Sequence, residues 1–287
     1  MANRGVKRVI PAINSQDGAG VKLKRSLGQR QHLRIDPFLM LDMFSSDNPD
    51  DYIAGFPPHP HRGFETVTYM LNGQMLHRDH MGNEGLLRSG GVQWMTAGRG
   101  VIHEERPQQE SGLMRGFQLW VNLPAAEKMK PAAYQNIEPE EVVVIVEPKV
   151  QLRIVAGEIE WKGHVYQGPV KGIVTAPLFV DITIAPHESV ELNVPSDRDG
   201  FIYLFEGQAA LLDDQGEQID NLVYEGASEL SKGDLVSIKA GDESARLLLI
   251  AARPLNEPVV QYGPFVMNST AEIEQALNDY RQGVLTE

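Results

Sequence analysis

Two short motifs hold the residues of this sequence best suited to bind a metal ion. His59-Pro-His61 and His103-Glu-Glu105 together offer three imidazoles and a carboxylate. Side chains two positions apart on a β-strand point to the same face, so each motif can direct both of its side chains to one side of a sheet. If that face lines a small barrel, the four groups can reach one ion. Such a set suits Fe(II), Mn(II), Ni(II) or Co(II) and leaves coordination positions open.

Glu65 is an alternative source of the carboxylate. It lies four residues after His61, and on a strand it has the same parity as the two histidines before it. The residues by themselves therefore leave Glu65 and Glu105 as competing fourth ligands.

The other histidines and the nearby arginines receive structural interpretations. His77 and His80 precede a turn at Gly82, which predicts the exposed end of a hairpin. Arg62 and Arg99 are expected to pair with acidic side chains at the surface, because the chain carries a formal charge of −13. No role is assigned to His32, His164 or His187.

The elements that would position these residues are short β-strands. Hydrophobic residues make up 42% of the 287 positions, enough for a sizeable core, and 27 glycines and 18 prolines separate short apolar runs. Such runs at 65–72, 91–96 and 114–123 predict an all-β sandwich or barrel. One amphipathic helix is expected at 269–283, with a capping serine or threonine at its start and a core-facing stripe at Ile273, Ala276, Leu277 and Tyr280.

Composition excludes several classes of protein. The chain has no cysteine, so disulfides, zinc–thiolate sites, iron–sulfur clusters and cysteine nucleophiles are excluded. Its negative charge argues against direct binding to nucleic acid or to anionic membranes. It contains neither a signal-peptide core nor an apolar run of membrane-spanning length, and we expect a soluble cytoplasmic protein.

An internal duplication is indicated by two pairs of similar segments. Residues 200–207 resemble 66–73, and 232–241 resemble 89–98. We therefore expect two domains, residues 1–137 and 138–287, each built on the same scheme.

Longer motifs across nearly the whole chain resemble the pirin family. They are Asp36-Pro-Phe-Leu39, Gly55-Phe-Pro57, His59-Pro-His-Arg-Gly-Phe-Glu-Thr-Val-Thr-Tyr69, Gln93-Trp-Met-Thr-Ala-Gly-Arg-Gly100, Gln118-Leu-Trp-Val-Asn-Leu123, Glu257-Pro-Val259 and Gly263-Pro-Phe-Val-Met-Asn268. The resemblance implies two tandem cupin (jelly-roll-like β-sandwich) barrels, of which the N-terminal one holds a metal, usually iron.

The resemblance also implies a ligand set of His59, His61, His103 and Glu105, which ranks Glu105 above Glu65. When positions are counted back from Gly207 as from Gly73, Asn193 and Pro195 take the places of the first two histidines. These residues cannot rebuild the site, so the C-terminal barrel is expected to lack metal ligands.

Two functions are implied by the resemblance. The first is a quercetin 2,3-dioxygenase that cleaves a flavonol, a small aromatic substrate, with O2. In it Glu105 would accept the substrate proton and Fe(II) is the expected ion, with Mn, Ni or Co as alternatives. The second is an iron-dependent, redox-sensing regulator that acts through protein partners.

Overall fold

The computed structural model describes residues 2–287, which form two compact units. The N-terminal unit comprises residues 14–25, 38–139 and 255–287, and the C-terminal unit comprises residues 2–13, 26–37 and 140–254. The chain passes from the N-terminal unit to the C-terminal unit between residues 139 and 140, close to the predicted boundary between residues 137 and 138. The terminal segments differ from that prediction, because each belongs to the unit built mainly from the other half of the sequence.

In the N-terminal unit a seven-stranded and a four-stranded antiparallel sheet form the cupin barrel. The seven-stranded sheet contains, in spatial order, β12 (Ala133–Ile137), β9 (Val92–Thr96), β6 (Phe64–Asn72), β11 (Met114–Asn122), β4 (Phe38–Ser46), β3 (Val21–Arg25) and β2 (Ile13–Asp17). The four-stranded sheet contains β5 (Phe56–His61), β10 (Val101–Pro107), β7 (Gln74–Asp79) and β8 (Glu84–Arg88). Two 3₁₀ turns accompany them, η1 (Pro49–Asp51) and η2 (Ala125–Glu127).

The C-terminal unit has the same pair of sheets. Its seven-stranded sheet contains β1 (Val6–Pro11), β22 (Gly226–Leu230), β19 (Asp199–Glu206), β24 (Ala245–Ala252), β17 (Leu178–Ile184), β14 (Val150–Ala156) and β13 (Val143–Val146). Its four-stranded sheet contains β18 (Ser189–Asn193), β23 (Leu235–Ala240), β20 (Ala209–Leu212) and β21 (Gln218–Asn221), and a hairpin adds β15 (Glu158–Trp161) and β16 (His164–Gln167).

The matching strand orders confirm the duplication but correct one of its alignments. β6 and β19 hold the same place in the two larger sheets, as the similarity of 66–73 to 200–207 predicts. The second predicted pair is wrong. β9 lies in a larger sheet, whereas β23 lies between β18 and β20, in the place that β10 holds between β5 and β7. A Gly-x-Val/Leu run precedes both β9, a strand of a seven-stranded sheet, and β23, a strand of a four-stranded sheet. The motif by itself therefore does not show to which sheet a strand belongs.

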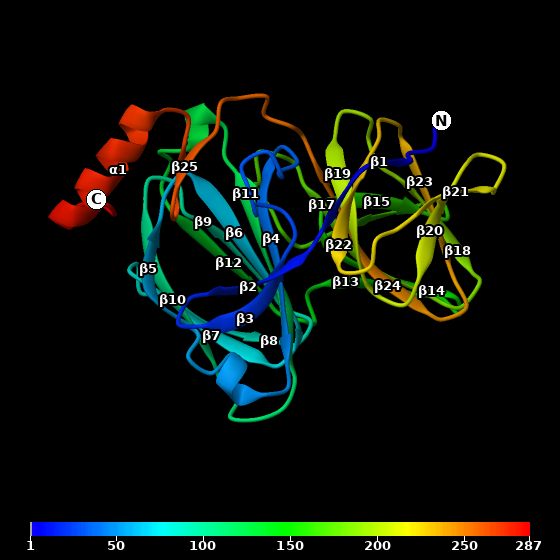
Figure 1. Ribbon diagram of the computed structural model, residues 1–287, viewed down its shortest axis with the longest axis horizontal. Coiled ribbons are helices and arrows are strands. Elements are labelled where there is room, and N and C mark those ends of the chain that lie inside the picture. The colour runs from blue at the N-terminus through cyan, green and yellow to red at the C-terminus, as the bar shows by residue number, and fades with distance from the viewer. Residues whose placement is uncertain (1) are drawn as a thin grey trace. The chain divides into compact units, whose positions relative to one another are not determined.

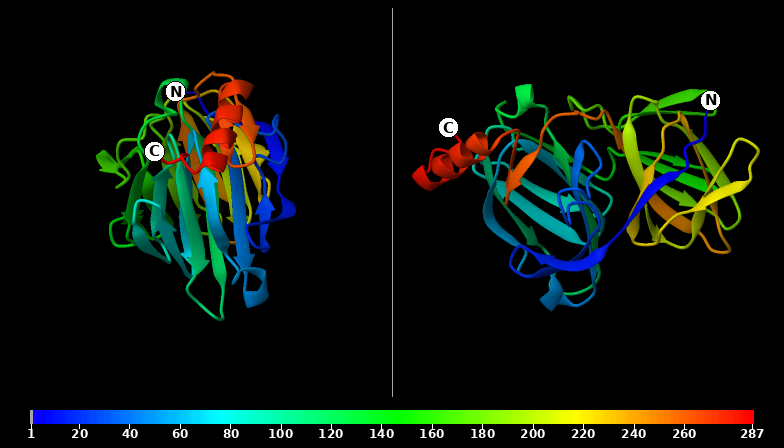
Figure 2. Two further views of the ribbon diagram at one scale, coloured as in Figure 1. Left: turned by 90° about the vertical axis from the view of Figure 1, so that its left-hand side faces the viewer. Right: turned by 45° about the horizontal axis from the view of Figure 1, so that its top comes forward.

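The N-terminal segment joins one of these sheets, and the C-terminal segment forms a separate hairpin followed by the helix. β1 pairs antiparallel with β22 in the C-terminal unit, and Figure 1 shows the two strands side by side. At the other end of the chain, the hairpin of β25 (Val260–Tyr262) and β26 (Phe265–Met267) leads into α1 (Thr270–Gln282). Figure 2 shows this orange-to-red segment against the strands of the N-terminal unit.

The predicted helix is confirmed together with its caps. The Ser269 side chain accepts from the backbone N–H of Glu272, and Gly283 ends the helix with φ of 75°, in the left-handed region that glycine adopts at low cost. Ile273 and Ala276 are buried against Phe265 and Met267 of β26. Of the predicted stripe, Leu277 is half-buried and Tyr280 is exposed. No helix in the described chain has the length and apolar character that crossing a bilayer requires.

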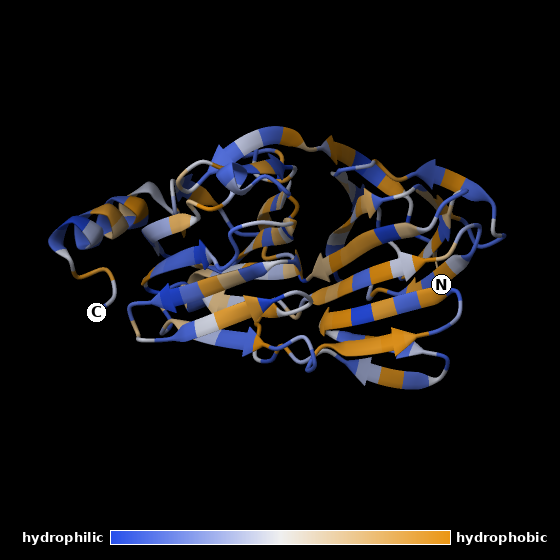
Figure 3. Cartoon of the chain, turned by 90° about the horizontal axis from the view of Figure 1, so that it is seen from below, coloured by the Kyte–Doolittle hydropathy of each residue, from blue (hydrophilic) through white to orange (hydrophobic). Residues whose placement is uncertain are grey.

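Alternation of apolar and polar side chains forms both barrels, and Figure 3 shows it as bands along the strands. In the C-terminal unit the inward positions are aliphatic, among them Leu152, Leu192, Ile202, Leu211 and Leu249. The inward positions around the histidine motifs of the N-terminal unit are largely polar instead. The polar side chains buried in the N-terminal unit include His61, His103 and Glu105.

Candidate metal centre

Two neighbouring strands bring the three predicted histidines together. β5 carries His59 and His61, β10 carries His103, and the antiparallel register places His103 directly opposite His59. Directly opposed residues share a face of the sheet. Phe56 of β5 pairs with Glu105 of β10, and His59 pairs with His103. Two residues, Pro57 and Pro58, lie between the paired positions on β5, but only one lies between them on β10, so β5 has a bulge at these prolines.

The three rings converge on one point. One ligand nitrogen from each of His59, His61 and His103 lies within 4.8 Å of the others, and the ring centroids are 4.4–4.9 Å apart. The bulge aims the carbonyl of Pro57 at His59, whose Nδ1 lies 2.8 Å from this oxygen. His59 Nδ1 therefore carries the proton, and its Nε2 remains a free donor atom.

Within this group of three histidines, two buried ring nitrogens, His61 Nδ1 and His103 Nε2, have no hydrogen-bond partner among residues 2–287. Unpaired buried polar atoms are costly, and a site that presents several of them together is suited to a ligand. Burial, followed by the charges of neighbouring histidines, places the pKa values of His61 and His103 well below the usual range, and burial lowers the pKa of His59. All three imidazoles are therefore neutral at pH 7, as metal ligation requires.

The spacing also fits a single ion. Metal–imidazole bonds are about 2.1 Å long, so two nitrogens that bind one ion lie at most about 4.2 Å apart. The observed limit of 4.8 Å exceeds this by an amount that small rotations of the rings can supply. The donor set and its neutral state thus fit a divalent transition metal.

Of the two competing carboxylates, Glu105 lies on the same side of its sheet as the histidines. It shares β10 with His103 at the two-residue spacing and is buried. Its Oε1 accepts a hydrogen bond of 2.9 Å from the Thr68 hydroxyl, and burial raises its pKa to about 7. The group of convergent nitrogens consists of the three histidines, so the role of Glu105 as a fourth ligand stays a prediction.

Glu65 lies on the other face of β6 from Thr68, because the two positions are three apart on a strand. Its Oε1 accepts a hydrogen bond of 2.7 Å from Thr96, and it is 1% exposed. Burial raises the pKa of Glu65, and the Thr96 hydroxyl opposes this shift. Glu65 and Glu105 therefore lie at opposite faces of β6. The positions of the two residues in the sequence did not make this distinction.

His77 is the residue that the sequence interpretation missed. Instead of lying at an exposed hairpin end it is 2% exposed, and its Nδ1 is 3.4 Å from Nδ1 of His103. His80 is exposed, as expected. The available signal was the alternation of β7, in which Met75, His77 and Asp79 share the inward face. Burial lowers the pKa of His77, against the raising effect of Asp79.

Aromatic side chains and the C-terminal segment line the remaining wall. His61 contacts Phe64 and Trp120 edge-on at ring distances of 5.1 and 5.4 Å. Val266 of β26 packs on Phe64. A side chain at Gly63, which has φ of 89°, would place its Cβ 2.0 Å from the Val266 carbonyl oxygen. Only glycine at position 63 therefore allows β26 to lie against the turn that follows β5, the strand that carries His59 and His61.

Comparison with known proteins identifies the family. The model of the family described as Pirin matches residues 20–121, and that of the Pirin C-terminal cupin domain matches residues 179–286. The chain belongs to the pirin family. It is a member with both cupin domains, in agreement with the fold.

Its relatives within the family are similar over nearly their full length. A Pseudomonas aeruginosa protein named "Putative quercetin 2,3-dioxygenase" is 49% identical over 273 residues, 94% of each chain. A "Pirin-like protein" of Caulobacter vibrioides is 41% identical over 284 residues, 99% of each chain. The crystal structure of a quercetin 2,3-dioxygenase from Acinetobacter baumannii matches with a TM-score of 0.88 at 33% identity, covering 99% of this chain and 98% of that one.

In this pirin-family chain the C-terminal barrel has different residues at the corresponding positions. Asn193 of β18 pairs with Leu235 of β23, as His59 pairs with His103 in the first barrel. Asn193 and Pro195 are exposed, and aliphatic side chains fill the barrel interior. This barrel thus presents no inward imidazole where the first presents three.

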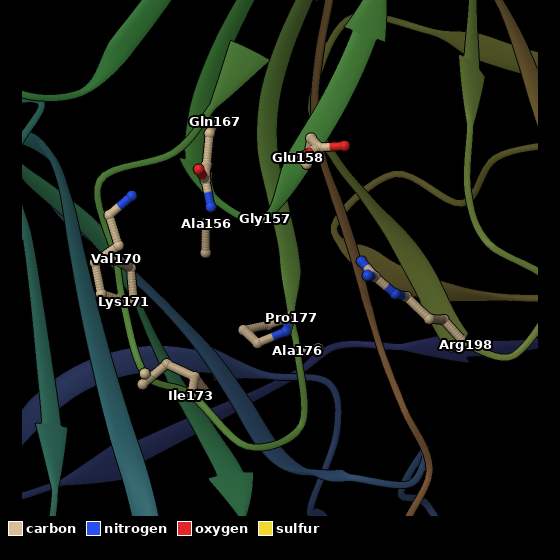
Figure 4. Close-up of a pocket in the computed structure, with 11 residues that line it drawn as sticks. Ala156, Gly157, Glu158, Gln167, Val170, Lys171, Ile173, Ala176, Pro177 and Arg198 are labelled. Atoms are coloured by element: carbon tan, nitrogen blue, oxygen red, sulfur yellow. The ribbon is translucent and has the colours of Figure 1, made fainter. Parts of the chain in front are cut away.

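A cavity of about 250 Å³ lies elsewhere in the C-terminal unit. Figure 4 shows Val170, Lys171 and Ile173 on one side of it and Glu158 and Arg198 on the other. Its walls carry charges of both signs and no histidine, so we assign it no part in the chemistry of the histidine site.

Proposed function

We propose that this protein is a metal-dependent dioxygenase that cleaves a flavonol such as quercetin with O2. The observation that carries the proposal is the convergence of three neutral imidazoles within 4.8 Å, inside a barrel that also holds Glu105. Family relatives named as quercetin 2,3-dioxygenases support the reaction and the substrate class.

The ligands of the metal would be His59, His61 and His103, with Glu105 completing the set. We propose Fe(II) as the ion, and the same donors accept Mn(II), Ni(II) or Co(II). When bound, such an ion supplies a Lewis acid that favours the deprotonated form of the oxygen at the 3-hydroxyl/4-carbonyl edge of the flavonol.

Glu105 is the group that would accept the 3-hydroxyl proton. In the metal-free protein burial raises the pKa of this carboxyl group to about 7, and a raised pKa suits a group that accepts a proton at neutral pH. Thr68 donates to Oε1 and so fixes the plane of the carboxyl group. We therefore assign the proton to Oε2.

The flat rings of the substrate would pack against the aromatic wall. Phe64 and Trp120 lie 4.4 Å apart in a tilted pair beside His61, and Trp120 is partly exposed. Their apolar faces exclude water and orient the flavonol with its oxygen-bearing edge toward the histidines.

The test is turnover by protein loaded separately with each of the four ions. Loaded protein should consume quercetin and O2 and release CO in equal amounts. His59→Ala and His103→Ala should lose both bound metal and CO release, whereas the exposed His164→Ala, in the C-terminal unit, should keep both. Full turnover in both ligand variants would refute the metal-centred reaction. Elemental analysis of the protein as isolated identifies the ion.

A further inference from the structure

His103 is the histidine of the cluster that contacts a fourth imidazole. Its Nδ1 lies 3.4 Å from Nδ1 of His77, and its Nε2 has no hydrogen-bond partner among the described residues. Both rings are 2% exposed. Because Nδ1 is engaged with His77, Nε2 is the atom that His103 can offer to a metal.

The contact between two Nδ1 atoms contains one proton, and its position decides whether His103 can bind a metal. If His103 Nδ1–H donates to His77, the His103 Nε2 lone pair is free. If His77 Nδ1–H donates instead, the proton of His103 lies on Nε2 and blocks that atom. A neutral imidazole has only these two tautomers, and the hydrogen bond at one nitrogen sets the state of the other.

Asp79 distinguishes between the two arrangements. Its Oδ2 lies 3.5 Å from His77 Nε2, and the Asp79 side chain is 0% exposed. In the first arrangement His77 Nε2 carries a proton and faces the carboxylate as N–H. In the second, the Nε2 lone pair would face a negative charge between two buried side chains, which is unfavourable. The carboxylate therefore favours the first arrangement.

Asp79 and His77 are both held rigidly enough to make this selection. Asp79 Oδ1 accepts from the backbone N–H groups of Met81 and Asn83 at 2.9 and 3.0 Å, and its Oδ2 accepts from the Asn83 side chain at 2.8 Å. The ring of His77 stacks on Tyr134, with centroids 4.5 Å apart and planes inclined by 17°. Neither side chain can turn without losing these contacts.

We propose that Asp79, His77 and His103 form a chain of polar contacts, Asp79 Oδ2 to His77 Nε2 at 3.5 Å and His77 Nδ1 to His103 Nδ1 at 3.4 Å, that fixes the Nδ1–H tautomer of His103 and so presents its Nε2 to the metal. Asp79 and His77 act as positioning residues, since neither touches the ion. The inference rests on the proposed function in one respect, that His103 is a ligand. It concerns which residues prepare this ligand, and it can be tested in the metal-free protein.

The first measurement is ¹⁵N NMR of the histidine rings in metal-free protein, which reports directly which nitrogen carries the proton. In the wild type, His103 Nε2 should be unprotonated. In Asp79→Asn the two backbone N–H groups retain the amide oxygen, so the amide N–H₂ faces His77 Nε2 and donates to it. This reverses the chain and should move the proton of His103 to Nε2. A protonated His103 Nε2 in the wild type would overturn the proposal.

The second measurement is the affinity for Ni(II) by titration. Loss of a group that orients a metal-bound histidine costs about 10–100-fold in affinity, and we expect this for Asp79→Asn and His77→Phe. His77→Asn keeps an acceptor near the position of Nδ1 and should recover most of the affinity. Arg78→Ala, an exposed side chain on the opposite face of β7, is the matched control and should bind as the wild type does.

The outcomes separate this inference from the proposed function. If the wild type binds Ni(II) but fails to oxidise flavonols, the function fails while the positioning chain stands on the NMR result. If Asp79→Asn changes neither the tautomer nor the affinity, the inference fails while the function stands. If Asp79→Asn does not fold, the pair His77→Phe and His77→Asn decides the question, and equal affinities in these two variants would refute the chain.

Discussion

Arg62 and Asp279 form an ion pair with Nη1 2.6 Å from Oδ2, although 217 positions separate them in the sequence. Arg62 directly follows the candidate ligand His61 and is 4% exposed, and Asp279 lies on α1 and is 19% exposed. The same guanidinium donates to the carbonyl oxygens of Arg99 and Leu285. One buried side chain thus attaches the C-terminal helix to the turn beside the histidine cluster, whereas the sequence predicted a surface pair.

Removal of Asp279 should release α1. In Asp279→Ala the buried guanidinium keeps its charge without a counterion, and we expect a loss of roughly 2 kcal/mol in the free energy of unfolding, less than for a fully buried pair because Asp279 is partly exposed. Denaturant unfolding gives the loss, and hydrogen exchange should show faster exchange in α1. The exposed Glu274→Ala on the same helix is the control, and an equal effect of the two changes would contradict the prediction.

Of the two buried glutamates, only Glu105 should affect metal binding. Glu105→Gln removes a charged oxygen on the face that bears the histidines. Substitution of a residue that only contacts a metal ligand typically lowers the affinity by roughly 10-fold or more, and we expect Glu105→Gln to lower it at least that much. Glu65→Gln changes a side chain on the other face of β6, bonded to Thr96, and should leave the affinity unchanged. Isothermal titration with Ni(II) compares them. A larger loss in Glu65→Gln would restore Glu65 as the ligand.

Features set by neighbouring residues were predictable from the sequence. The strands at 65–72, 91–96 and 114–123 appear as β6, β9 and β11 because alternation of apolar and polar side chains is a local pattern. The caps of α1 are likewise local. The three histidines were found because the two-residue spacings of His59 and His61 on β5 and of His103 and Glu105 on β10 each indicate a shared face of the sheet.

Features set by pairing between distant segments were not predictable. β1 belongs with β22, more than 200 positions away, and its own burial pattern is mostly exposed or half-buried. His77 lies among the polar residues Arg78, Asp79 and His80, which read locally as a hairpin end. It is buried because β7 pairs with β10 and places His77 opposite Glu105. Register of this kind is a property of the whole sheet.

Arg4 should stabilise the C-terminal unit without affecting the metal site. Its side chain is completely buried and donates to the carbonyl oxygens of Arg198, Val194 and Pro195 at 2.9, 3.3 and 2.8 Å. Arg4→Met leaves these acceptors without their donor, partly offset by the removal of a buried charge, so we expect a loss of about 2 kcal/mol.

The measurement for Arg4→Met is hydrogen exchange resolved by segment. Exchange should accelerate in β18 and β19, which flank the three carbonyl groups, and metal affinity should stay at the wild-type value because the histidines belong to the other unit. Arg30→Met changes an exposed arginine of the same unit and should have no effect. Weaker metal binding in Arg4→Met would show that the N-terminal segment has a further role.

Lys128 should make stability depend on pH in the alkaline range. Its Nζ donates to Gly63 O, Asn122 Oδ1 and Val266 O at 2.7, 2.6 and 3.0 Å. These acceptors are neutral, so burial lowers the pKa of Lys128 to about 8. The pKa in the unfolded chain is about 10.4, so between these values the unfolded state binds more protons and stability rises with pH. Below pH 8 the ammonium persists in both states and contributes no slope.

Lys128→Met removes this titration. The wild-type free energy of unfolding minus that of the variant should therefore increase from pH 8 to about 10.4, by about 3 kcal/mol for a shift of this size. Denaturant unfolding of the wild type and the variant at several pH values measures the difference. A constant difference for Lys128→Met would mean that the three oxygens compensate the ammonium fully for the loss of water.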